Sequence, residues 1–197
     1  MRKKTKEMAY LAIFTSIIIL MTFTPFIGYI TVGVFSITTI PIVVIIGAIF
    51  LGLKGSLWLS LMFGVFSLIR ATMPGAMSDP MFLNPLISIL PRLLFGLFTY
   101  YIYSVFDKTK INNNMKYVLT FVLSILFHTV IVCVMFALVK PLWFIDTMNA
   151  VQGTYPYINT IFMVIIMAFL INGALEAVIG SLVGPVIVRQ LVKYKEN

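Results

Sequence analysis

Ionisable side chains stand inside long apolar stretches of the chain, and they have the clearest capacity for chemistry. Arg92, His128 and Glu176 each lie in a segment otherwise rich in Leu, Ile, Val and Phe. A charged group in such a segment is costly to keep from water, so it is a functional candidate by default. We expect an arginine there to bind an anion or to pair with a carboxylate.

Polar or small residues recur every four positions around these groups. The three series are Asn84, Ser88, Arg92, Gly96 and Tyr100; Thr120, Ser124 and His128; and Asn172, Glu176 and Gly180. Residues four apart share one face of a helix, so each series predicts a polar stripe. The simplest arrangement points three stripes at one interior, where Asn172 and Glu176 could fix polar groups of a small solute.

Structural roles remain open for the same residues. Arg92 lies about ten residues, or roughly 15 Å, into its segment, whereas Glu176 lies about 18 residues, or roughly 27 Å, from the outer end of its own. An ion pair between them would then need tilt or a broken helix. Glu176 could instead support close helix packing beside Gly180 and Gly184. A lone His128 predicts a hydrogen-bonded interior histidine or a ligand contact, and no metal site.

The elements that carry these residues must face lipid. Of 197 residues, 61% are hydrophobic and 10% are charged, against roughly 25% charged in soluble domains, and the mean hydropathy is +1.08. We predict an all-α integral membrane protein, with six transmembrane helices in a single domain. The expected spans are 8–24, 41–53, 55–69, 84–105, 117–139 and 158–188. Residues 28–39, rich in Thr, Val, Phe and Gly, are expected to be extended or irregular.

The basic residues predict the orientation in the membrane. Six spans place both termini on one side, and eleven Lys or Arg residues fall there, against Arg70 and Lys140 on the other. Because the side rich in Lys and Arg is cytoplasmic, both termini are predicted in the cytoplasm of a multi-pass plasma-membrane protein. The net charge of +8 is thus a topology signal and not a sign of nucleic-acid binding. The basic N-terminus resembles a secretory signal, but a retained first span is the better interpretation.

Several classes of protein find no support in the sequence. The single cysteine, Cys133, rules out a disulfide within the chain and reads as a buried apolar residue. There is no Walker A loop, dinucleotide fingerprint or His/Cys cluster with metal spacing. We therefore expect no cofactor, no metal, no ATP hydrolysis and no enzymatic activity.

The first predicted span has a face of small residues, formed by Ala9, Ala12 and Ser16. Small residues allow another helix to approach closely. The partner is either another helix of this chain or another subunit, and spacing alone favours the intramolecular packing.

The order of short motifs makes the sequence similar to a known family. The motifs are Ala12-x-x-x-Ser16, Phe63-Gly64 with Ser67-Leu68, Asn84-Pro85-Leu86, Leu90-Pro91-Arg92, and Asn172 with Glu176. Over nearly its whole length the chain resembles the substrate-binding S components of energy-coupling factor (ECF) vitamin transporters. Within that family it is most similar to the pantothenate-type subunits.

The resemblance implies a six-helix fold with a vitamin site near the outer face, formed by helices four to six and covered by outer loops. It also implies assembly with a transmembrane coupling subunit and two cytosolic ATPases, through a helix-one pattern that Ala12 and Ser16 occupy here. Phe127 and His128 stand where related sequences usually have Thr-Asn. A carboxylate-bearing vitamin such as pantothenate would suit Arg92, while pyridoxine, riboflavin, folate and hydroxymethylpyrimidine remain alternatives.

Two other functions fit the sequence less well. A membrane scaffold protein would need neither Arg92 nor Glu176 inside its spans. A membrane enzyme would need more than Glu176 and His128, which form neither a carboxylate cluster nor a nucleophile–base pair.

Overall fold

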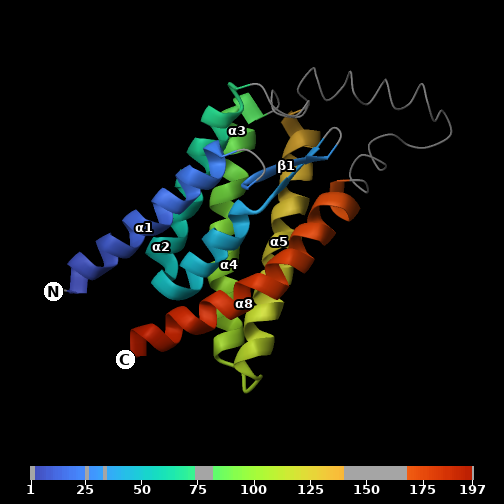
Figure 1. The fold of residues 1–197 in the computed structure, drawn as a ribbon. Coiled ribbons are helices and arrows are strands. Elements are labelled where there is room, and N and C mark those ends of the chain that lie inside the picture. Colours follow the sequence, from blue (N-terminus) through green and yellow to red (C-terminus); the bar gives the residue numbers. More distant parts are fainter. Residues whose placement is uncertain (1–2, 25–26, 33–34, 74–81, 140–167, 197) are drawn as a thin grey trace.

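The computed structural model describes residues 3–24, 27–32, 35–73, 82–139 and 168–196. Figure 1 shows a bundle of long helices with a short hairpin at one end. The elements are α1 (Lys3–Phe23), β1 (Tyr29–Val32), β2 (Phe35–Thr38), α2 (Ile40–Arg70), α3 (Pro85–Ser88), α4 (Leu90–Asp107), α5 (Asn113–Val139), the π-helix η2 (Ala168–Gly173) and α8 (Ala174–Glu196). Five helices of this part of the chain are long and apolar enough to cross a membrane.

Helix α2 folds back on itself at Gly52. This residue has φ 74° and ψ −164°, a backbone conformation that interrupts the helix and favours glycine. A Cβ atom on Gly47 would overlap the side chain of Leu59, although twelve residues of straight helix would separate them by about 18 Å. The two arms correspond to the spans predicted at 41–53 and 55–69. The count of six spans stays a prediction, because residues 140–167 lie outside the described residues.

The stretch predicted to be extended forms an antiparallel hairpin of β1 and β2, in which Tyr29 pairs with Thr38. Its base is closed by the Thr39 amide, which donates to the Gly28 carbonyl at 3.1 Å. The Thr39 hydroxyl also donates to the Ile27 carbonyl at 2.6 Å. Gly28 is required where it stands, because a Cβ atom there would overlap the Met21 carbonyl. The prediction of a non-helical segment is therefore confirmed.

The segment predicted as one span at 84–105 is two helices. Asn84 caps α3, since its side-chain oxygen accepts from the Leu86 amide at 3.0 Å. The helix is interrupted at Ile89, and α4 then begins with Pro91 in its first turn. Proline fits there because the first turn of a helix needs no amide donor. Helix α4 lies close against α2, and Ser56 Oγ donates to the Gly96 carbonyl at 2.7 Å.

Helix α8 packs against α5 through glycines. A Cβ atom on Gly180 would meet Ile125, and one on Gly184 would overlap the ring of Phe121, so the predicted close contact is confirmed. The described part of this segment starts at Ala168 and its first part, 158–167, lies outside the described residues. The helix continues to Glu196 and not to 188 as predicted, because the Lys and Arg of the basic tail are good helix formers.

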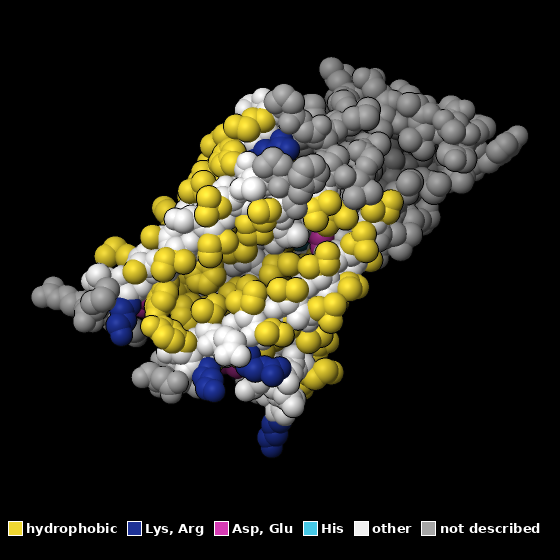
Figure 2. Space-filling view, viewed as in Figure 1, with side chains coloured by type: hydrophobic (Ala, Val, Ile, Leu, Met, Phe, Trp, Pro, Cys, Tyr) yellow, Lys and Arg dark blue, Asp and Glu magenta, His cyan; other side chains and the backbone are white. Residues whose placement is uncertain are grey.

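Apolar and basic residues occupy different parts of the bundle. The interior is built from large apolar side chains, among them Ile45, Phe63, Phe95 and Phe121. Figure 2 shows a broad hydrophobic surface, with Lys and Arg gathered mainly at the end where Figure 1 places both termini. Lys54 directly follows the reversal at Gly52, and Lys108 and Lys110 lie in the connection from α4 to α5. The orientation of this end toward the cytoplasm stays a prediction.

Candidate functional site

Arg92 lies in the first turn of α4 and is only 3% exposed. Its guanidinium carbon is 5.3 Å from the ring centroid of Phe63 and 4.7 Å from that of Phe82. Aromatic rings attract a cation over their faces, but they do not neutralise it. Arg92 is thus a buried cation held between aromatic side chains.

The hydrogen bonds of Arg92 leave one side of the guanidinium available. Nη1 donates to the Ile87 carbonyl at 2.7 Å, while the buried Nε has no acceptor in the described part of the chain. A carboxylate can pair with two N–H groups of a guanidinium at once. Since Nη1 is occupied, such a ligand would approach the Nε and Nη2 side.

Arg92 does not form an ion pair with Glu176 among the described residues, although the two charges lie close enough to interact. The sequence predicted Glu176 to lie deeper than Arg92, on the assumption of one continuous helix for each segment. The break at Ile89 and the π-helix before α8 change both positions, and each group lies in the first turn of its α-helix. The predicted difference in depth stays a prediction, because residues 158–167 of the sixth expected span lie outside the described residues.

Glu176 is 5% exposed and bound to the hairpin. Its Oε1 accepts from the Thr38 amide at 2.6 Å and from the Thr38 hydroxyl at 3.0 Å. Thr38 pairs with Tyr29 across the hairpin, and Tyr29 lies under the guanidinium of Arg70. The carboxylate of α8 is thus bonded to the second strand of the hairpin.

His128 packs between Phe63 and Phe95, with ring centroids 5.8 Å and 4.9 Å away. It is 5% exposed, and its Nε2 has no hydrogen-bond partner among the described residues. A buried polar atom without a partner costs about 1–3 kcal/mol. Because Phe63 contacts both His128 and Arg92, these two groups lie beside the same aromatic side chain.

The other predicted site residues contact neighbouring parts of the protein. Ser88 is fully buried and its hydroxyl donates to the Phe82 carbonyl. Asn84 caps α3 through its side chain. Asn172 is half-buried in η2, where Gly173 lies against Thr129 of α5. π-Helical turns occur often at functional sites. Ser88 and Asn84 therefore shape the segment that carries Phe82 toward Arg92.

Sequence reasoning missed Phe82, Tyr29 and Thr38. An aromatic or threonine residue in an apolar chain carries no signal of its own, and the contacts depend on tertiary folding of the hairpin. Proximity of Phe82 to Arg92 could have been suspected only from the proline-rich turn between them. Arg92, His128 and Glu176 are all buried, and the shared interior of the three stripes stays a prediction.

Comparison with known proteins identifies the family of this chain. Residues 6–188 match the model of the ECF transporter substrate-specific component, which covers nearly the whole chain. The chain belongs to that family. A pantothenate transporter, PanT, from Leuconostoc mesenteroides subsp. mesenteroides is 33% identical over 119 residues. The match spans 58% of this chain and 57% of the relative, so it covers little more than half of either protein.

Membership fixes the class of the protein. ECF substrate-specific components are transport proteins and not a class of enzymes, and the long apolar helices agree with a multi-pass protein of the plasma membrane. Cys133 is a free, buried cysteine as predicted. The part of the chain that the structure describes holds no group of His, Cys, Asp and Glu that could bind a metal ion.

The small-residue face of this ECF component points outward. Ala9, Ala12 and Ser16 are exposed on α1, so packing within the described part of the chain does not account for them. The expectation of intramolecular packing from spacing is wrong here, because α1 uses its other face, with Phe14 and Ile18, against the core. A groove of about 490 Å³ runs along the exposed face, lined by Met8, Leu11, Ala12, Thr15, Ser16 and Trp58.

Proposed function

We propose that this chain is the vitamin-binding S component of an ECF-type transporter and that its substrate carries a carboxylate, with pantothenate as the best candidate. The observation that carries the proposal is Arg92, a buried cation with aromatic faces, no carboxylate partner in the described residues and an Nε without an acceptor. A buried charge left alone is strongly destabilising. A substrate carboxylate would supply the missing partner, and the named relative transports pantothenate.

Around that contact, the other residues take complementary roles in the proposal. His128 would hydrogen-bond a second polar group of the substrate through Nε2, and Asn172 would bind a polar group from the side of η2. Ser88 and Asn84 would act through the position of Phe82. Glu176 completes the set of residues at the site.

The wider arrangement is part of the same proposal. Six spans would place both termini in the cytoplasm and the hairpin end of the bundle outside, as the positive-inside rule requires. The substrate would enter at the outer end, and a transmembrane coupling subunit with two cytosolic ATPases would drive its release inside. No cofactor, metal or nucleic acid takes part.

Calorimetry on the purified protein, after removal of bound small molecules by partial unfolding, tests the function. Pantothenate should bind with a stoichiometry near one, and mass spectrometry of the untreated protein should find the same compound. Pyridoxine, riboflavin, folate and hydroxymethylpyrimidine form the comparison panel. Binding of one of these instead would keep the S component and change its substrate, whereas no binding in the whole panel would contradict the function.

The exposed groove on α1 is the proposed contact with the coupling subunit. Ala12→Leu should leave vitamin affinity unchanged and reduce co-purification of the coupling subunit at least tenfold, because a larger side chain would fill the groove. Ile13→Trp, on an exposed position outside the groove lining, is the matched control and should assemble normally. Equal loss of assembly in both variants would move the contact away from the groove.

A further inference from the structure

We propose that Glu176 is a positioning residue, which holds the β1–β2 hairpin at the vitamin site through Thr38 and does not contact the substrate with its charge. The inference rests on the proposed function for the identity of the site, and it gives Glu176 a role other than substrate contact. Affinity would depend on Glu176 because the hairpin depends on it.

The bonds of Glu176 carry the first step. Both hydrogen bonds from Thr38 end on the same oxygen, Oε1, at 2.6 Å and 3.0 Å. The two residues are 138 positions apart in sequence, so this contact joins the hairpin to the last helix across the bundle.

The register of the hairpin carries the second step. Directly opposed residues of an antiparallel pair share one face, and Thr38 lies opposite Tyr29. Tyr29 also lies under the guanidinium of Arg70, whose central carbon is 5.6 Å from the ring centroid. Fixing Thr38 therefore fixes both strands beside η2, the element that carries the proposed substrate contact Asn172.

The charge of Glu176 also favours a positioning role over direct contact with the substrate. Glu176 is not paired with Arg92 within the described residues, and a carboxylate substrate has the same sign as Glu176. Direct contact between two carboxylates disfavours ionisation of one of them. A carboxylate committed to hydrogen bonds with the hairpin avoids that repulsion and keeps Arg92 available for the substrate.

Variants at the two residues separate positioning from direct contact. Glu176→Gln keeps an oxygen at the same place but removes the charge, so pantothenate affinity should stay within about threefold of wild type. Glu176→Ala removes the acceptor of two hydrogen bonds and should weaken binding about tenfold or more, mainly through faster dissociation. Thr38→Val keeps the amide and the shape but loses the hydroxyl, and should weaken binding a few-fold.

The double variant decides whether the two residues act as one unit. Glu176→Ala with Thr38→Val should bind no more weakly than Glu176→Ala alone, because the same contact is already lost. Overturning results are Glu176→Gln as weak as Glu176→Ala, or losses that add fully in the double variant. Either outcome would assign the charge of Glu176 to the substrate.

Hydrogen exchange in nanodiscs without any vitamin keeps this test independent of the proposed function. Glu176→Ala should raise the exchange of backbone amides in residues 29–38, including that of Thr38, while Glu176→Gln should restore most of the protection. Unchanged exchange in Glu176→Ala would overturn the positioning role even if pantothenate binds. Failure of the wild type to bind any vitamin, with the exchange result as expected, would instead remove the function and leave the hairpin contact.

Discussion

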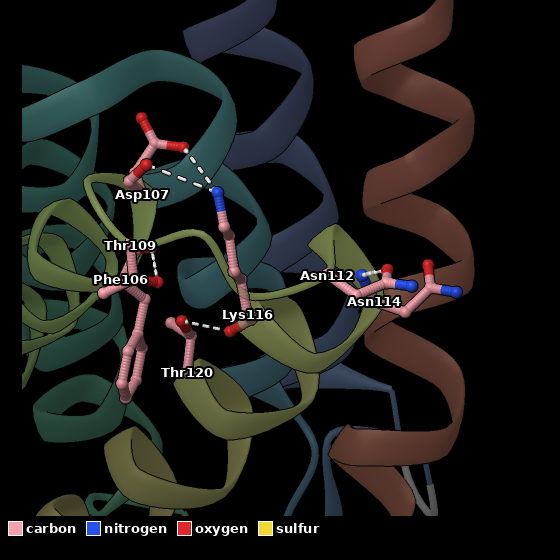
Figure 3. A network of polar contacts seen from close by, with 7 residues as sticks. All are labelled: Phe106, Asp107, Thr109, Asn112, Asn114, Lys116 and Thr120. Carbon is pink, nitrogen blue, oxygen red and sulfur yellow. Dashed lines mark hydrogen bonds and ion pairs between the residues drawn. The ribbon is translucent and has the colours of Figure 1, made fainter.

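Charged side chains have different surroundings in two parts of the helix pair α4 and α5. At the end near the chain termini, Lys116 Nζ lies 3.9 Å from an Asp107 carboxylate oxygen and donates to the Asp107 carbonyl at 3.3 Å. Figure 3 shows this pair with further hydrogen bonds of the connecting turn. Thr109 donates to the Phe106 carbonyl at 2.6 Å, and the Asn114 amide donates to the Asn112 side chain at 3.0 Å.

Away from this turn, Arg92 at the start of α4 and His128 near the middle of α5 are buried among aromatic rings and keep polar atoms without partners in the described residues. In the α4–α5 turn, by contrast, the polar groups bond to one another, and the Asp107 side chain is 62% exposed. The difference separates a structural charge from the charge that we propose to bind the substrate. A paired charge near water needs nothing further, whereas a deeply buried and unpaired one needs a partner that the described chain does not supply.

The largest effect is expected from removal of the unpaired cation. Arg92→Ala should lower pantothenate affinity about 100-fold or more, because charge-assisted hydrogen bonds to the carboxylate are lost in a buried site. Arg92→Lys should still lose about tenfold, since an ammonium cannot reproduce the two-pronged pairing. Calorimetry on folded, monodisperse protein provides the measurement.

Arg189→Ala is the matched control for Arg92→Ala. Arg189 is an exposed arginine of α8, and its loss should not change affinity. Binding of an anionic vitamin by Arg92→Ala at wild-type strength would show that the buried cation is structural, and the contrast between the two parts would then lose its meaning.

A smaller effect is expected at the imidazole. His128→Phe should reduce affinity about tenfold, because the hydrogen bond from Nε2 to the substrate is lost. The melting temperature should stay equal or rise, since a phenyl ring suits the neighbouring rings of Phe63 and Phe95 and removes a buried polar atom without a partner.

Ser124→Ala provides the comparison one helical turn away from His128. Its hydroxyl is also buried without a partner in the described residues, but it is not part of the proposed site. We expect unchanged affinity. A loss in Ser124→Ala as large as that in His128→Phe would mean that any change in this interior weakens binding, and that His128 has no specific contact.

Much of this arrangement follows from the sequence because it depends on local rules. Fourfold spacing places Arg92, His128 and Glu176 on inward faces whatever the exact packing, since lipid cannot hold their charges. The non-helical character of residues 28–39 follows from a composition unsuited to a helix, and the reversal near Lys54 follows from the charge at a span end. Each of these predictions needed only the periodicity of one segment.

The interruptions of helices were harder to predict. The break at Ile89 lies between the Asn84 cap and Pro91, where the backbone of Ile89 lies close against Gly64 of α2. The contact of Glu176 with Thr38 joins segments with no shared periodicity. The outward direction of Ala12 and Ser16 depends on which face of α1 covers the core. Such choices are made by tertiary packing, on which the spacing of one segment carries no information.

The smallest effect is expected at the α4–α5 turn, where Lys116 and Asp107 are paired. Lys116→Met should change pantothenate affinity less than twofold and the melting temperature by less than about 4 °C, equivalent to about 1 kcal/mol for a chain of this size. The ion pair is long, and the exposure of Asp107 weakens it by screening. Lys116 also lies near the N-terminus of α5, where a positive charge opposes the helix dipole, so its removal recovers part of the loss. Thermal unfolding in detergent measures the shift. A loss of affinity comparable to that of His128→Phe would mean that the two parts of the helix pair are coupled, and the division between structural and ligand-binding charge would have to be abandoned.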